Sequence, residues 1–64
     1  MQLGEKIRRA RNAQGLTQRQ LAAKIGVWPA VLCHWEINKR TPNVDSLIRV
    51  AMALGVPAAS LLPD

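Results

Sequence analysis

Glycine and proline divide this chain into short segments, and that punctuation limits its fold more than any other feature. Beyond Gly4, one or the other stands at positions 15, 26, 29, 42, 55, 57 and 63. The intervening segments contain neither Phe nor Tyr and show no sustained alternation of apolar and polar residues, so strands are not expected. Apolar residues instead gather on one side of each segment at helical spacing. The pattern predicts an all-α protein, a compact bundle of five short helices.

The outer helices follow from this periodicity. The first is expected over residues 2–14, and it ends at Gly15. Asn43 is expected to cap the fourth helix, which Gly55 ends, and Pro57 to open a short fifth helix. The expected inward residues are Leu3, Ile7 and Ala10 on the first helix, Val44, Leu47, Ile48, Ala51 and Leu54 on the fourth, and Ala58, Leu61 and Leu62 on the fifth.

The two middle helices are joined by a very short connection. Thr17 and Gln20 have the spacing of a capping box, in which each side chain bonds the other residue's backbone N–H. Gly26 ends this helix after about two turns. Pro29 suits the first position of the next helix, because its missing N–H costs nothing there. A tight turn after the small residue Ala22 sets two helices at about 90–120°. Residues 17–37 are therefore predicted to form a helix-turn-helix.

Length and composition exclude several other classes of protein. The chain has 64 residues, which predicts a single domain over residues 1–64. Its lone cysteine cannot form an internal disulfide, and no stretch is long and apolar enough to span a bilayer. We expect a soluble, cytoplasmic protein without membrane association.

Positive charge is concentrated in the first two thirds of the chain. Residues 1–40 carry eight Lys and Arg against two acids, whereas residues 41–64 carry one Arg against two Asp. An asymmetric basic surface attracts polyanions such as nucleic acids, although a net charge of +5 is also common in soluble small domains.

Beyond these features, the chain resembles the helix-turn-helix DNA-binding domains of the phage-repressor and Cro type, also called XRE-like, which are five-helix bundles. The ordered set that carries the resemblance is residues 3–8, 15–18, 21–22, 26–27, Leu32, Trp35, Glu36, Pro42, 54–56 and 61–62. It implies a cytoplasmic, nucleoid-associated transcriptional regulator of bacterial or phage origin, expected to be a repressor. The partner would be double-stranded DNA.

The resemblance also assigns roles to individual residues. Phosphate contacts are implied for Gln18, Arg19, Lys39, Arg40 and Arg8, and base reading for Pro29, Ala30, Cys33 and His34. Arg11 and Glu36 match a family pair that joins the first and third helices, and both lie at the edges of predicted buried faces. A homodimer on a palindromic operator is implied, with Val56, Leu61 and Leu62 as its contact patch.

The third helix departs from the family pattern. Trp28 replaces the usual Ser or Thr cap, and Pro29 and Ala30 cannot form paired hydrogen bonds to bases. Trp28 could pack against the second helix or the turn, or it could contact a partner, whereas Trp35 is expected in the core. The apolar face favours an alternative function, a protein-interaction module of antitoxin or antirepressor type.

An enzyme is not expected. Cys33 and His34 are adjacent, so on a helix they do not face each other, and two ligands cannot complete a zinc site. No cofactor or metal is predicted.

Overall fold

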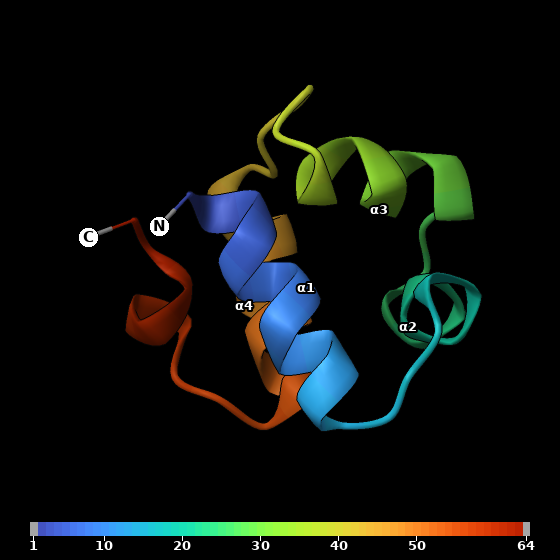
Figure 1. Ribbon diagram of the computed structural model, residues 1–64, viewed down its shortest axis with the longest axis horizontal. Coiled ribbons are helices and arrows are strands. Elements are labelled where there is room, and N and C mark those ends of the chain that lie inside the picture. Colours follow the sequence, from blue (N-terminus) through green and yellow to red (C-terminus); the bar gives the residue numbers. More distant parts are fainter. Residues whose placement is uncertain (1, 64) are drawn as a thin grey trace.

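Four α-helices and one 3₁₀ turn make up residues 2–63, the part of the chain that the computed structural model describes. They are α1 (Leu3–Ala13), α2 (Gln18–Ile25), α3 (Pro29–Glu36), α4 (Val44–Leu54) and η1 (Ala58–Leu61). In Figure 1, α1 lies across α4, with α2 and α3 on one side of this pair and η1 on the other. These residues contain no strand, which confirms the all-α prediction.

The core fills the space between all five elements. Its fully buried side chains include Ile7 of α1, Leu21 of α2, Leu32 of α3, Leu54 of α4 and Leu61 of η1. Burying a side chain of this size stabilises the fold by about 1.5–3 kcal/mol. Each element contributes at least one such residue, so no helix is peripheral to the packing.

The helix ends follow the predicted caps. Thr17 accepts a hydrogen bond from the Gln20 N–H at 3.0 Å, and the Thr17 N–H donates to the Gln20 side chain at 2.9 Å, which completes the capping box. Asn43 caps α4 by accepting from the Ser46 N–H at 2.8 Å. Asn38 adopts φ of +61°, the left-handed conformation that ends the helical path after α3.

Three predictions about the C-terminal third are wrong, one of them that Leu62 faces inward, since its side chain is 50% exposed. The fifth helix is a single 3₁₀ turn, because Pro57 and Pro63 leave too few residues for α-helical hydrogen bonds to repeat. On α4, Val44 and Ile48 are exposed and Val50 is fully buried, the reverse of the prediction. The buried face is rotated because α4 packs against α2 as well as α1 and η1.

Candidate nucleic-acid interface

The turn between α2 and α3 builds the helix-turn-helix. The backbone N–H groups of Gly26 and Val27 both donate to the Ala22 carbonyl, at 2.9 and 3.0 Å. Gly26 has φ of +80°, a conformation that a residue with a Cβ rarely adopts. Ala22 is completely buried, and its small side chain lets the two helices approach each other. The turn therefore fixes the direction of α3 relative to α2.

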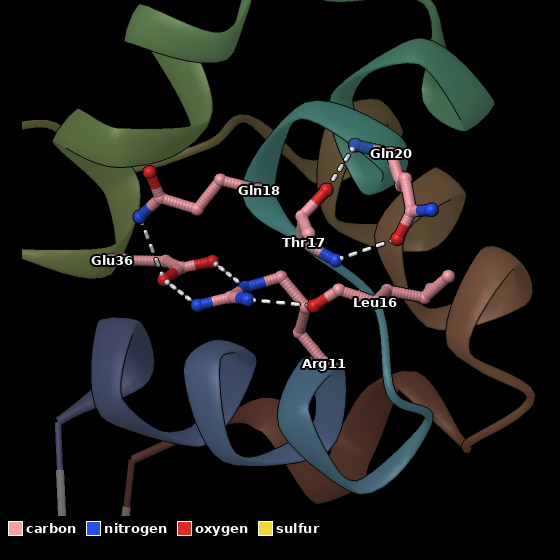
Figure 2. A network of polar contacts seen from close by, with 6 residues as sticks. All are labelled: Arg11, Leu16, Thr17, Gln18, Gln20 and Glu36. Carbon is pink, nitrogen blue, oxygen red and sulfur yellow. Dashed lines mark hydrogen bonds and ion pairs between the residues drawn. The ribbon is translucent and has the colours of Figure 1, made fainter.

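A buried ion pair ties α1 to the end of α3. The Arg11 guanidinium donates to both Glu36 carboxylate oxygens, from Nε at 2.7 Å and from Nη2 at 3.0 Å, and from Nη1 to the Leu16 carbonyl at 2.7 Å (Figure 2). The Arg11 and Glu36 side chains are only 11% and 1% exposed. The sequence suggested this pair, and the structure brings its two members together in a bidentate geometry.

Gln18 joins this network from the first turn of α2. Its side-chain Nε2 donates to Glu36 Oε1 at 3.1 Å, so one carboxylate holds groups from α1 and α2 (Figure 2). A phosphate contact was predicted for Gln18, whereas this bond to Glu36 was not. Gln18 is half-exposed, and its backbone N–H lies in the first turn of α2, where helix N–H groups lack helical partners.

A second contact between α1 and α3 was also missed. The Gly4 N–H donates to Asn38 Oδ1 at 3.0 Å. A Cβ on Gly4 would collide with the backbone oxygens of Trp35 and Glu36 and with Asn38 Oδ1. The available signal was a glycine on the inward face of a predicted helix, where an absent side chain indicates close approach of another backbone.

The basic residues divide into two groups. Lys6 donates to the Leu62 carbonyl at 2.7 Å and Lys24 to the Ala53 carbonyl at 3.0 Å, so both hold neighbouring elements together. Within residues 2–63, no hydrogen bond or ion pair engages the side chains of Arg8, Arg9, Arg19, Lys39, Arg40 and Arg49.

Four of these unpartnered cations belong to segments that border α3. Lys39 and Arg40 follow α3 directly, and Arg19 lies beside Gln18 in the first turn of α2. Arg8 lies four residues after Gly4 and three before Arg11, both of which contact the end of α3, so it shares their side of α1. Each of the four is exposed.

The exposed surface of α3 is largely apolar. Trp28 and Ile37 are 79% and 60% exposed, and Pro29 and Ala30 are exposed as well. Cys33 and His34 are half-exposed. A hollow is lined by Ala30 and His34 of α3, Arg40 of the following loop and Ser46 of α4.

The structure separates the two tryptophans. Trp35 is 6% exposed and belongs to the core, as predicted. Trp28 is 79% exposed, so little of its side chain packs against the protein.

One residue of the predicted dimer patch is misplaced. Leu61 is 1% exposed and closes the core, because η1 turns it toward α1 and α4. Val56 is half-buried and Leu62 is half-exposed. The patch, as predicted from three residues, is therefore wrong at Leu61.

Neither a membrane span nor a metal cluster is found in residues 2–63. No helix there combines the length and apolar character needed to cross a bilayer. Three or more His, Cys, Asp or Glu side chains do not come together as a metal site in that range.

Comparison with known proteins places this geometry in a family. The family model described as helix-turn-helix matches residues 7–61, and the chain belongs to this family of DNA-binding, XRE-type transcription regulators. The P22 c2 repressor, solved in complex with a synthetic operator, superposes with a TM-score of 0.92 at 29% identity, over 97% of this chain and 94% of that one.

Longer proteins also contain related sequences. Endothelial differentiation-related factor 1 of Rattus norvegicus is 36% identical over 56 residues, which cover 88% of this chain and 38% of that protein. The HTH-type transcriptional activator BcrR of Enterococcus faecalis is 34% identical over 62 residues, which cover 97% of this chain and 30% of BcrR. The chain thus spans about a third of the length of these relatives.

Proposed function

We propose that this chain binds double-stranded DNA in a sequence-specific manner and represses transcription as a homodimer on a palindromic operator. Helix α3 enters the major groove, with Pro29, Ala30, Cys33 and His34 toward the base edges. Gln18, Arg19, Lys39, Arg40 and Arg8 contact phosphates. The observation that carries the proposal is the set of exposed, unpartnered cations beside an exposed helix whose orientation the buried network fixes.

The buried network supports the phosphate contacts by positioning. Glu36 holds the side chain of Gln18 at 3.1 Å, so Gln18 meets DNA with little further loss of rotamer freedom. The first turn of α2 also supplies free backbone N–H groups and the positive end of the helix dipole.

The homodimer follows from the size of a single reading helix. Such a helix of eight residues contacts few base pairs, and two copies on half-sites about 10 bp apart, or a multiple of this, double the contacts. Val56 and Leu62 at the C-terminal end contribute to the dimer contact, whereas Leu61 supports them from the core.

Selection from a random-sequence duplex library tests the proposal, with affinities measured at two salt concentrations. We expect an enriched palindrome and, for a dimer with four cationic contacts per subunit, a slope of log K against log salt of about −7. Absence of both an enriched motif and a steep slope would refute DNA binding.

Charge variants assign the phosphate contacts. Lys39→Ala is expected to reduce the magnitude of the slope by about 1 for each subunit and to weaken all sequences alike. Arg49→Ala is the matched control, because Arg49 is also exposed and unpartnered but lines a hollow formed with Lys24 and Met52. Equal effects of the two variants would refute a phosphate contact at Lys39.

A protein-interaction module is the second candidate function. The observation that favours it is the exposure of Trp28 and Ile37 on α3, since large exposed apolar side chains often mark protein contacts. Trp28→Ala would then abolish binding to a protein partner and leave DNA affinity and its salt dependence unchanged.

A further inference from the structure

Helix α4 is apolar on two opposite sides, although the protein covers only one of them. The inner side is buried against α1, α2 and η1. The outer side carries Val44, Ile48 and Met52, which are 72%, 43% and 77% exposed. These residues follow one another at intervals of four, so they form one stripe along two turns, the α4 stripe. A helix that is apolar on all sides is normally buried on all sides, so the stripe indicates a contact with another molecule.

The charges beside the α4 stripe are arranged for a partner with the same pattern. Asp45 and Arg49 are exposed and lie one turn apart. Within residues 2–63, no hydrogen bond or ion pair engages either side chain. A partner surface of a single sign would be attracted by one of these charges and repelled by the other. A helix that carries the same two charges in the reverse order satisfies both, and α4 of a second copy does so when it runs antiparallel.

A two-fold axis through the middle of the α4 stripe generates this arrangement. Ile48 then lies against Ile48 of the second copy, and Val44 lies against Met52 of the second copy. The two-fold axis keeps each flank of one helix beside the same flank of the other. Asp45 therefore lies within reach of Arg49 of the second copy, and the same pair recurs on the other side of the axis.

We propose that the α4 stripe binds the α4 stripe of a second copy of this chain in an antiparallel arrangement, with Asp45 of each copy paired with Arg49 of the other. The inference goes beyond the proposed function, because it requires neither DNA nor the C-terminal residues Val56 and Leu62. Two different self-contacts on one chain would allow pairs of dimers to associate into tetramers.

The size of the stripe sets the expected strength of this contact. Three apolar side chains from each copy bury much less than the about 800 Å² per partner that is typical of stable complexes. We therefore expect a dissociation constant on the order of 100 µM for the α4 contact alone.

Sedimentation equilibrium of the chain without DNA tests the proposal, at concentrations from about 10 µM to about 1 mM, which bracket this constant. Asp45→Arg and Arg49→Asp each place like charges opposite one another at both ends of the contact. Each variant alone is expected to associate about tenfold more weakly than the wild type. An equimolar mixture of the two pairs opposite charges again, so its association is expected to return to within about twofold of the wild type.

Net charge alone predicts a different result. Asp45→Arg raises the net charge of +5 by two and Arg49→Asp lowers it by two, so general repulsion would weaken the first self-association and strengthen the second. Weaker association of Arg49→Asp is therefore diagnostic of the α4 contact. Glu5→Arg and Arg9→Asp are the matched controls, because they make the same changes one turn apart on α1, where no large apolar side chain is exposed. Association of Arg9→Asp is expected to be at least as tight as that of the wild type.

A neutral substitution tests the apolar part of the contact. Met52→Asn leaves the net charge unchanged, and it is expected to weaken association about tenfold, because both Val44–Met52 contacts of the pair are lost. Since Met52 is 77% exposed, thermal unfolding is expected to show that the variant is as stable as the wild type.

The outcomes separate this inference from the proposed function. A wild-type chain that stays monomeric up to about 1 mM overturns it. Association of Arg49→Asp as tight as that of the wild type also overturns it, as does a mixture that associates no more tightly than its components. The α4 stripe would then bind a different partner. Failure to select a DNA motif refutes the proposed function and leaves the α4 contact intact.

Discussion

Separating Arg11 from Glu36 is expected to destabilise the fold more than replacing both residues. The Glu36 side chain is 1% exposed in the structure. If it stays there in Arg11→Met, its carboxylate keeps only the Gln18 side chain as a hydrogen-bond donor, at 3.1 Å. Removing one partner of a buried ion pair typically costs about 3–5 kcal/mol. Arg11→Met also leaves the Leu16 carbonyl without its 2.7 Å donor.

That cost is comparable to the whole stability of the domain. At roughly 0.05–0.15 kcal/mol per residue, a chain of 64 residues unfolds with about 3–10 kcal/mol. Glu36→Leu is expected to cost somewhat less than Arg11→Met, because the long Arg11 side chain can move its charge toward water. In Arg11→Met with Glu36→Leu no buried charge is left, so the double variant is expected to lose less than Arg11→Met alone.

The assay is a double-mutant cycle by urea unfolding, followed by circular dichroism, with trimethylamine N-oxide added to keep the single variants folded. We expect a coupling energy of about 3 kcal/mol, at least as large as the cost of Glu36→Leu, because the double variant loses less than Arg11→Met alone. Asp45→Leu and Arg49→Met form the control cycle, since both residues are exposed on α4 one turn apart, and coupling there should stay below about 0.5 kcal/mol. Additive costs at Arg11 and Glu36 would refute a buried, mutually dependent pair.

Three further substitutions test separate features by the same unfolding assay. Gly4→Ala is expected to cost about 1–3 kcal/mol or more, because its Cβ meets the backbone oxygens of α3, and an unchanged midpoint would contradict that close approach. Thr17→Ala should lower the free energy of unfolding by about 1 kcal/mol, because the Gln20 N–H loses the Thr17 hydroxyl as its acceptor. A loss below a few tenths of a kcal/mol would argue against the capping box. Trp35→Ala should cost about 3–5 kcal/mol and Trp28→Ala less than about 0.5, so similar losses would show that Trp28 is not exposed in solution.

Local signals in the sequence were sufficient for the N-terminal two thirds of the fold. The capping box at Thr17, the left-handed Gly26 and the proline at the start of α3 each act through neighbouring residues, so the sequence alone locates them. The face of α4 depends on three packing partners at once, and periodicity predicted Ile48 inward where Val50 is buried.

Only part of the candidate site was predicted from the sequence, because some of its contacts join residues far apart in the chain. The family resemblance suggested the Arg11–Glu36 pair, which the structure brings together at 2.7 Å. The contacts of Gln18 with Glu36 and of Gly4 with Asn38 join residues 18 and 34 positions apart. Such contacts depend on how the helices cross, and no short pattern in the sequence encodes that crossing.

The burial of Leu61 has a consequence for how the protein is made. Leu61 closes a core that already includes Ile7 and Leu54, so the ribosome must release nearly all of this segment before the core is complete. A nascent chain stalled after α4 would expose Leu54 and the apolar side of α1 that η1 covers. Such chains are expected to be substrates for chaperones and proteases.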